Sequence, residues 1–314
     1  MAQVANVDLV GVGLNATDTL IHLERYPGLG EKAEYRSATV LPGGQVASTV
    51  VACAQWGLST RYVGKLGEDE AARLHGEAFA RAGVETRILT VPGASAQSLI
   101  FVDASGERTV LNRRDDALLM RPQELNREWV VRAGALHVDG WDTEAATAAA
   151  SWAREAGVPV IADLDAAYPG IEKLLEKIDY LIVSRDFPEL ITGERDLKKA
   201  LRRLQIDYGC RLTAATLGEQ GVLAWNGSYF HHSPAYRVPV VDTTGAGDIF
   251  HAGFIYGLLQ GWTLERQLDF ACAAAALNCT GEGARGGIRA VEAIEDLMAN
   301  GERHEAAEFV ASVD

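Results

Sequence analysis

Short apolar segments alternate with helix-forming segments along almost the whole chain, and this alternation restricts the fold more than any other feature. Apolar runs of strand length lie at residues 7–13, 60–63, 135–138, 159–162, 180–183 and 212–217. Helical periodicity fills most of the intervals and continues beyond them, at residues 69–82, 143–156, 197–208, 245–260 and 264–280. Because parallel strands need crossover helices, the pattern predicts an α/β fold with a central, mainly parallel sheet between helices.

Two strand-like segments break this alternation within the first third of the chain. They lie at residues 34–41 and 97–111, and the second folds back on itself at Asp103-Ala104-Ser105-Gly106. We expect both segments to belong to a small satellite sheet beside the main one. The sequence has no tandem repeat and no Ser/Pro-rich linker, so we predict one domain over residues 1–314 with these strands inserted.

The charge balance excludes some classes of partner. The 314 residues include 43 Asp and Glu against 29 Lys and Arg, a net charge of −14, whereas a nucleic-acid binder needs clustered basic residues. No apolar run approaches the length of a membrane span, and the N-terminus lacks the basic stretch of a signal peptide. We therefore expect a cytoplasmic protein that binds neither nucleic acid nor membrane. Its cysteines show no metal-ligand spacing and are predicted to be core residues: Cys53, Cys210, Cys272 and Cys279.

The strongest local motif is a glycine-rich turn that opens a predicted helix, Asp242-Thr243-Thr244-Gly245-Ala246-Gly247-Asp248. Small residues before a helix let backbone N–H groups approach an anion such as a phosphate, and the helix dipole adds positive potential. A carboxylate beside that anion would repel it unless it has another task, such as taking a proton from an attacking hydroxyl. Asp248 is thus either a catalytic base or an acidic residue in the first turn of an ordinary helix.

Two further turns are candidates for ligand contacts. Residues 42–48 begin another predicted helix, with the glycine pair Gly43-Gly44 allowing close approach and with Gln45 and Ser48 as hydrogen-bonding side chains. Residues 216–221 end a strand and enter a hairpin. Each segment, taken alone, is equally typical of an ordinary turn. No Walker A sequence occurs, and His231-His232 lie on a strand, where they point to opposite faces and cannot chelate one metal ion as a pair.

Taken together and in this order, these segments resemble the ribokinase/PfkB family of carbohydrate kinases. The matching pieces are Gly13 with Asp18, the Gly43-Gly44 helix start, and residues 63–69, 106–109, 216–221 and 242–248. The resemblance covers nearly the whole chain and implies a ribokinase-like three-layer fold whose small β-sheet is a lid over the substrate. By eye, the sequence is most similar to the ketohexokinase and sulfofructose kinase branch.

The resemblance implies a role for each matching residue. Asp248 would be the catalytic base, and the N–H groups of Gly245, Ala246 and Gly247 would form the anion hole for the transferred phosphoryl group. The residues that would contact the nucleotide are Ser184, Thr216, Gly218, Gly221 and Asn278. Those that would contact the sugar are Asp18, Gly43, Gly44, Gln45, Ser48, Arg108, Asn112, Arg114 and Asp139.

The same resemblance implies cofactors and partners. ATP with Mg²⁺ follows from phosphoryl transfer, because the metal neutralises the phosphate oxygens. Many relatives also bind a monovalent cation such as K⁺ behind the anion hole, and the matching positions are the Asp242 side chain and the carbonyls of Thr244, Asn278, Gly281 and Gly283. A small-molecule sugar would be the substrate. Lids often pair between subunits in this family, which implies a homodimer.

Three departures from the family pattern concern the site. After the strand at 180–183, Ser184 and Phe187 replace the Asn and Glu of an Asn-x-x-Glu motif linked to magnesium and phosphate, which leaves Asp186 or Glu189 as substitutes. Gln45 and Ser48 stand where two Asn residues are common. Asp139 lies near the place of a sugar-binding Glu in ribokinase.

We therefore predict an ATP-dependent kinase that phosphorylates a ketose or a related sugar. A nucleoside kinase of the same fold is one alternative, and a catalytically silent sugar- or nucleotide-binding protein is another, motivated by the missing Asn-x-x-Glu motif. The intact Asp248 favours an enzyme, and the polar run Asn112-Arg113-Arg114 favours a sugar. The two arginines could hold an acidic or phosphorylated group, although a solvated basic pair is the simpler interpretation.

Overall fold

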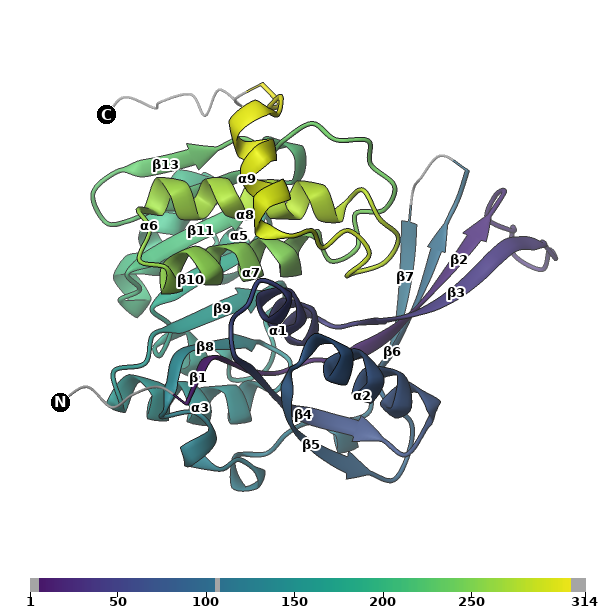
Figure 1. Ribbon diagram of the computed structural model, residues 1–314, viewed down its shortest axis with the longest axis horizontal. Coiled ribbons are helices and arrows are strands. Elements are labelled where there is room, and N and C mark those ends of the chain that lie inside the picture. The colour runs from purple at the N-terminus through teal and green to yellow at the C-terminus, as the bar shows by residue number, and fades with distance from the viewer. Residues whose placement is uncertain (1–5, 105–107, 306–314) are drawn as a thin grey trace.

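A nine-stranded sheet forms the centre of the computed structural model, which describes residues 6–104 and 108–305 (Figure 1). Its strands follow the order β13-β12-β11-β10-β9-β8-β1-β4-β5, and all neighbours from β11 to β5 are parallel. β12 and β13 add an antiparallel hairpin at one edge. The bounds are β1 Val7–Val12, β4 Thr60–Gly67, β5 Glu85–Val91, β8 Ala133–Asp139, β9 Val160–Leu164, β10 Tyr180–Ser184, β11 Leu212–Thr216, β12 Val222–Trp225 and β13 Phe230–Ser233.

Helices cover both faces of this sheet and confirm the predicted three layers. One apolar core joins the sheet to α1, α2, α7, α8 and α9, and a second core joins it to α3, α4, α5 and α6. Parallel strands that are covered on both faces bury nearly every side chain, which explains their continuous apolar runs. The bounds are α1 Gln45–Gln55, α2 Glu70–Ala82, α3 Thr143–Glu155, α4 Ile171–Leu175, α5 Phe187–Thr192, α6 Leu197–Tyr208, α7 Ala246–Leu259, α8 Leu264–Asn278 and α9 Val291–Asn300.

A four-stranded sheet projects from the main body, at the right of Figure 1. Its order is β3-β2-β6-β7, with β2 parallel to β6 and the outer pairs antiparallel. The bounds are β2 Ala16–Leu23, β3 Tyr35–Gly43, β6 Gln97–Val102 and β7 Arg108–Arg113. The two predicted insertions therefore form strands of a separate small sheet. β3 ends at Gly43 and leads directly into α1, so it carries the glycine pair toward the main sheet.

The sequence analysis missed two strands, β2 and β5, and three helices, α4, α5 and α9. β2 begins Ala16-Thr17-Asp18-Thr19, whose polar residues are unusual in a strand buried at this end. Residues 302–305, after α9, contain no helix. All four cysteines are free and buried, as predicted.

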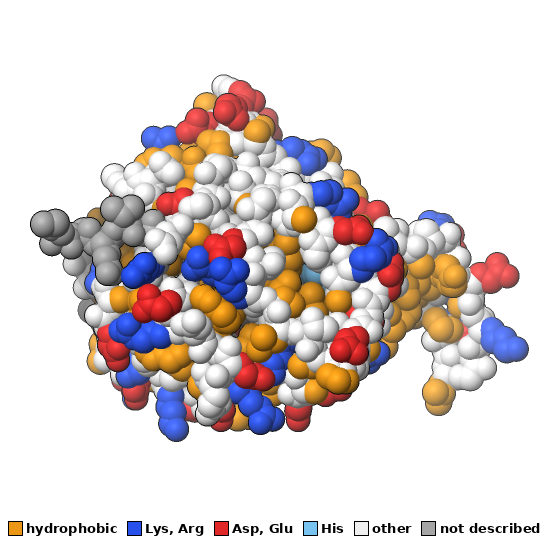
Figure 2. Space-filling view, turned by 60° about the horizontal axis from the view of Figure 1, so that its bottom comes forward, with side chains coloured by type: hydrophobic (Ala, Val, Ile, Leu, Met, Phe, Trp, Pro, Cys, Tyr) orange, Lys and Arg blue, Asp and Glu red, His pale blue; other side chains and the backbone are white. Residues whose placement is uncertain are grey.

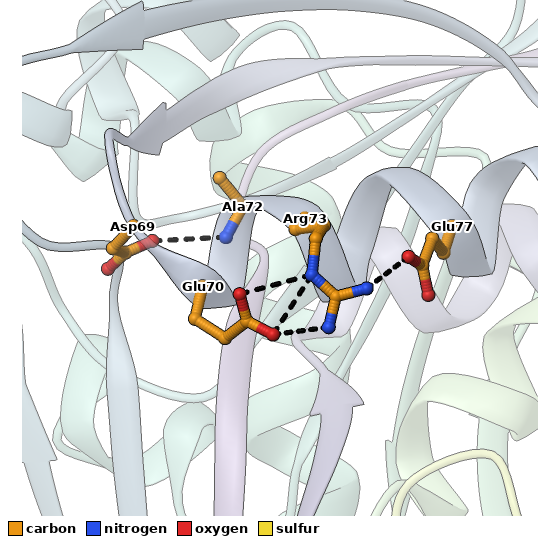
Figure 3. A network of polar contacts seen from close by, with 5 residues as sticks. All are labelled: Asp69, Glu70, Ala72, Arg73 and Glu77. Atoms are coloured by element: carbon orange, nitrogen blue, oxygen red, sulfur yellow. Dashed lines mark hydrogen bonds and ion pairs between the residues drawn. The ribbon is translucent and has the colours of Figure 1, made fainter.

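The turn between β4 and α2 ties the small sheet to the main body through Asp69. Asp69 caps α2 by accepting from the N–H of Ala72 (Figure 3). It also accepts from the N–H of Ser95 at 2.7 Å, just before β6. Glu70 and Glu77 flank Arg73 on the exposed face of the helix. Asp69 thus fixes the chain where it enters the small sheet. Among the described residues, every helix is too short or too polar to traverse a lipid bilayer.

Candidate active site

The glycine-rich turn lies at the start of α7, as predicted, and its backbone cannot tolerate a larger residue at Gly245. Gly245 has φ +75°, and a Cβ there would lie 2.3 Å from the carbonyl oxygen of Ala284. Asp248 follows in the first turn of α7 and is half-buried. The hydroxyl of Thr49 lies 3.0 Å from the Asp248 carbonyl, which ties the start of α7 to α1. The loop at 281–287 and two helices therefore fix this turn.

The backbone N–H groups of the turn are available to an anion. Within the described part of the chain, the N–H groups of Gly245 and Gly247 have no protein acceptor, and that of Ala246 makes a bond of 3.3 Å to the Thr243 carbonyl. α7 has 14 residues, so its dipole reinforces the positive potential at this end. The arrangement has the chemistry of a phosphate-binding helix start.

The surroundings of Asp248 raise the pKa of its carboxyl group. Burial contributes most, followed by the negative charge of Asp163, while His251 and Arg285 act in the opposite direction. A raised pKa suits a group that must take up a proton during the reaction, since general bases work best with a pKa near the working pH. The carboxylate therefore has the acid–base properties that a catalytic base requires.

Asp18, Gly43 and Gly44 come together beside Asp248. A Cβ on Gly43 would lie 2.0 Å from Oδ2 of Asp18, so only glycine lets this carboxylate lie against the β3–α1 junction. Gly44 has φ +90° and packs against the backbone of Asn15. Burial raises the pKa of Asp18 to about 6, partly offset by a hydrogen bond with Ser98 and by the charge of Arg285. These predicted sugar-contacting residues form one group.

Arg285 is a residue that the sequence analysis did not select. Its Nη2 donates to the Gly43 carbonyl at 2.8 Å, and its Nε donates to Oγ of Ser48 at 3.1 Å. The guanidinium charge acts on both Asp18 and Asp248. The signal that could have identified it is the position of a single basic residue within the glycine-rich run Gly281-Glu282-Gly283-Ala284-Arg285-Gly286-Gly287.

Ser48 and Asp139 are buried and bonded to neighbouring protein groups. Ser48 is fully buried under Arg285. Asp139 is also fully buried, and its two oxygens accept from the N–H groups of Leu14 at 2.7 Å and Trp141 at 3.0 Å. Both side chains therefore already have hydrogen-bond partners in the protein, and their contact with the sugar stays a prediction.

Replacing Asp139 with Ala should lower the free energy of unfolding by roughly 2–4 kcal/mol, because the N–H groups of Leu14 and Trp141 would each lose a buried acceptor. Urea denaturation of both proteins measures the difference. Asp139→Asn should also destabilise the protein, since an amide NH₂ would face one of the two N–H donors. Equal stability of wild type and Asp139→Ala would contradict this structural role.

A buried polar cluster lies behind Asp248. Asp163, at the end of β9, accepts a hydrogen bond from Gln45 and lies 3.5 Å from Nδ1 of His251. The same Nδ1 is 2.8 Å from the Gly247 carbonyl, and Nε2 is 3.3 Å from the Ile182 carbonyl. His251 therefore holds the peptide of the anion-binding turn against the sheet. The helical spacing of Asp248 and His251 was a sequence signal that the analysis overlooked.

The predicted nucleotide-contacting residues lie at the ends of two neighbouring strands, except for Asn278. Ser184 and Thr216 are register partners at the carboxyl ends of β10 and β11, and Gly218 and Gly221 follow in left-handed or turn conformations. Ligands of α/β sheets bind at this edge. The Asn278 side chain is fully buried, with its amide nitrogen on the carbonyls of Thr244 and Ala284, so it holds the loop together. Phe187 is a core residue, which leaves no acidic side chain at that position of the missing motif.

The residues expected around a K⁺ ion converge, but they also bond to each other. The Asp242 carboxylate accepts from the N–H groups of Thr244 and Gly283, each at 2.8 Å. The Thr244 carbonyl accepts from Asn278. Gly281 packs against Gly286 in the same loop. The K⁺ site stays a prediction.

Three residues predicted to contact the sugar lie on β7 or directly after it, and their side chains have different surroundings. The Arg108 side chain lies outside the described residues, and Asn112 is exposed opposite Ser98. Arg114 is half-buried, with Nη1 2.8 Å from the hydroxyl of Tyr168 and its guanidinium 4.6 Å above the Trp141 ring. Arg114 is therefore held in place by aromatic side chains and is not a freely solvated cation.

Comparison with known proteins agrees with this geometry. The chain matches the pfkB family of carbohydrate kinases over residues 12–290. It is 31% identical to an ATP-dependent ribose-1-phosphate kinase of Halopiger xanaduensis, across 85% of this chain and 90% of that protein. It is 26% identical to a ribokinase of Staphylococcus aureus, across 92% and 99%. The structure of an Arabidopsis thaliana ribokinase complexed with ribose and ATP superposes with a TM-score of 0.82 and 25% identity, across 93% of this chain and 98% of that one. The chain belongs to the pfkB family of carbohydrate kinases, and its fold is ribokinase-like.

Proposed function

We propose that this protein transfers the γ-phosphoryl group of ATP to a hydroxyl group of a small carbohydrate. One observation carries the proposal: Asp248 stands in the first turn of α7, beside backbone N–H groups that have no acceptor among the residues that the structure describes. The carboxylate would take the hydroxyl proton while the hydroxyl oxygen attacks the γ-phosphorus and the bond to ADP breaks. The N–H groups of Gly245 and Gly247 would stabilise the charge on the transferred group.

Mg²⁺ would arrive with the nucleotide. In the described residues, no three His, Cys, Asp or Glu side chains are arranged as ligands of one metal ion. Mg²⁺ is commonly held by substrate phosphates and one or two carboxylates, so this arrangement fits a metal bound mainly by ATP. Asp165, exposed at the end of β9, raises the pKa of the buried Asp163, and this concentration of negative charge would favour a nearby cation. The metal would supply charge neutralisation of the phosphate oxygens.

The small sheet would act as the lid, and we propose that it also pairs two subunits. Several large apolar side chains are exposed on β3 and β7: Tyr35, Val40, Val110 and Leu111. Figure 2 shows hydrophobic side chains gathered on the projecting lobe. Sedimentation velocity would detect the homodimer, and a monomer at all concentrations would contradict it.

The identity of the sugar substrate is a separate and more specific part of the proposal. The ketose predicted from the sequence, and the placement in the ketohexokinase and sulfofructose kinase branch, stay predictions. Among the relatives, one acts on ribose 1-phosphate and another is a 5-dehydro-2-deoxygluconokinase of Geobacillus kaustophilus, so a pentose, a pentose phosphate and a sugar acid belong among the candidates. A nucleoside kinase remains the second candidate within the same fold.

A coupled assay of ADP release would test the function over ketoses, aldoses, sugar phosphates, sugar acids and nucleosides. We expect ADP release that depends on one class of carbohydrate. Release that depends on a nucleoside alone would favour the second candidate. ATP binding without any acceptor-dependent release would favour a silent binding protein.

The pH dependence of kcat/KM should report the ionisation of the Asp248 carboxyl group. The base must be ionised, and its pKa is raised, so kcat/KM should be highest above this pKa and fall as the pH is lowered through it. The fall should occur well above pH 4, near which an ordinary aspartate titrates. A profile that is flat from pH 8 to pH 4.5 would contradict the assignment.

A further inference from the structure

Arg114 carries a positive charge that no carboxylate of the described residues neutralises. Its Nη1 donates to the hydroxyl of Tyr168 at 2.8 Å, and the guanidinium lies 4.6 Å from the centroid of the Trp141 ring. No ion pair and no further hydrogen bond of Arg114 occurs within residues 6–104 and 108–305. Charges that are partly removed from water are normally paired, so this guanidinium is available to an anionic ligand.

The guanidinium is held in place but is still accessible. Arg114 is half-buried, and its Nε and Nη2 have no acceptor among the described residues. Both nitrogens keep contact with solvent, since the fully buried unpaired atoms of the described chain do not include them. The Tyr168 hydroxyl accepts from Arg114, which leaves its own proton for another acceptor. The pair therefore offers a ligand three donor atoms: Nε, Nη2 and Oη.

The main sheet places this pair near the candidate base. Tyr168 packs against Gly140, where an added Cβ would lie 2.7 Å from the Tyr168 ring. Gly140 directly follows Asp139 at the end of β8, and Asp139 is the register partner of Asp163 on β9, whose charge acts on the base. β9 separates β8 from β10 and β11, where the predicted nucleotide residues lie. A substrate with one hydroxyl at the base would therefore extend toward Arg114, away from ATP.

The small sheet leads to the same place. Asp18, Ser98 and Asn112 are successive register partners on β2, β6 and β7, so their side chains lie on one face of this sheet. Arg114 follows Asn112 by two residues, directly beyond the end of β7, which is the spacing of residues on one face of an extended chain. Through its bond to Tyr168, Arg114 joins this polar row to the main body.

We propose that Arg114 and Tyr168 bind an oxyanion of the substrate, a phosphate monoester or a carboxylate, at the end remote from the hydroxyl that Asp248 activates. This inference rests on the proposed kinase function and makes the substrate a sugar phosphate or a sugar acid. A guanidinium binds either oxyanion through two parallel N–H···O bonds, and the phenol adds a third donor. A neutral sugar has hydroxyls that accept such bonds, but it leaves the charge of Arg114 unpaired.

The acidic surroundings make the binding of an anion depend on Arg114. Burial, followed by the charge of Asp165, raises the pKa of Tyr168, and Asp139 acts in the same direction. Arg114 is the cation that opposes them. Without it, an oxyanion beside the Tyr168 hydroxyl would meet uncompensated negative charge. A variant without this cation should therefore prefer neutral sugars to anionic ones.

The test compares neutral and anionic sugars in wild type and in Arg114→Gln. The probes are D-ribose with D-ribose 1-phosphate, D-fructose with D-fructose 6-phosphate, and D-glucose with D-gluconate. ADP release is measured, together with calorimetric binding beside a non-hydrolysable ATP analogue. In wild type, the anionic member of at least one pair should have the higher kcat/KM and affinity, and that pair distinguishes phosphate from carboxylate. Arg114→Gln should lower both values for this anion by roughly 100-fold and leave its neutral partner unchanged.

Two further variants and one control sharpen the test. Arg114→Lys keeps the charge without the planar guanidinium and should recover only part of the affinity. Tyr168→Phe removes one donor and should weaken the same anion by a smaller factor. The matched control is Arg127→Gln, because Arg127 is exposed and bonds Glu155 on α3 at 3.3 Å. It should leave kcat/KM unchanged for every probe, and urea denaturation shows whether each variant is folded.

Two results would overturn the inference. One is a wild type that prefers the neutral member of every pair. The other is a folded Arg114→Gln protein in which neutral and anionic sugars are affected equally or not at all. Failure of the kinase function gives a different result. If Arg114→Gln selectively weakens the binding of an anionic sugar but no probe causes ADP release, the kinase proposal fails and the role of Arg114 stands.

Discussion

Asp248→Asn should lower kcat by roughly 10²–10⁴-fold, the usual contribution of a general base, while affinity for ATP stays close to that of wild type. Asparagine keeps the size of the side chain but cannot accept the hydroxyl proton. The N–H groups of Gly245 and Gly247 remain in place, so phosphate binding should persist. Steady-state kinetics and nucleotide titration of the two proteins measure these effects separately.

The control is Asp207→Asn, which makes the same chemical change in the surface ion pair between Asp207 and Arg203 on α6. It should leave kcat unchanged. Removing the charge of Asp248 also relieves a half-buried carboxylate of raised pKa, so Asp248→Asn should be at least as stable as wild type at neutral pH. Near-normal turnover in a folded Asp248→Asn protein would remove this residue from the mechanism.

Gly245→Ala should have the largest combined effect on stability and activity. The residue has φ +75°, and the new Cβ would lie 2.3–2.8 Å from backbone atoms of Ala284. Backbone strain and overlap together should cost roughly 2–5 kcal/mol of unfolding free energy. Either the turn or the loop at 281–287 must move, and a displacement of about 1 Å at the anion-binding groups should lower kcat/KM by roughly 10²-fold.

Gly247→Ala separates steric overlap from the loss of a glycine as such. A Cβ at Gly247 meets nothing within 4 Å, and its φ is not positive. Its unfolding free energy should therefore stay within about 1 kcal/mol of wild type. If Gly245→Ala were equally stable and equally active as wild type, the packing of the turn against Ala284 would not position the anion-binding groups.

The fold was predictable because its signals are local. The alternation of apolar runs and helical periods placed most strands of the large sheet, and its interruption located β3, β6 and β7. β2 was missed because its polar residues, Thr17, Asp18 and Thr19, break the apolar pattern of a strand. β5, at the edge of the sheet, is only partly buried and therefore lacks a continuous apolar run.

The part of the site that one turn forms could be predicted from the sequence. The contacts between segments far apart in the sequence could not. The Gly245–Asp248 turn follows from its own sequence and from family resemblance. Arg285 donates to the Ser48 hydroxyl although the two residues are 237 positions apart in the sequence, and no local sequence pattern predicts such a contact. Asp139 looked available as an acidic residue at a strand end, but the N–H of Leu14, 125 residues away, occupies it. Which side chains of the site are buried, and which groups they hydrogen-bond, depends on the folded chain and cannot be read from local sequence.

The most direct test of the account is ³¹P NMR of wild-type protein with ATP, Mg²⁺ and the sugar panel. The account predicts that the signals of ATP are replaced by those of ADP and a sugar phosphate ester in equal amounts, and that Asp248→Asn abolishes this conversion. Formation of ADP with inorganic phosphate alone, or an ester formed equally well by Asp248→Asn, would contradict it.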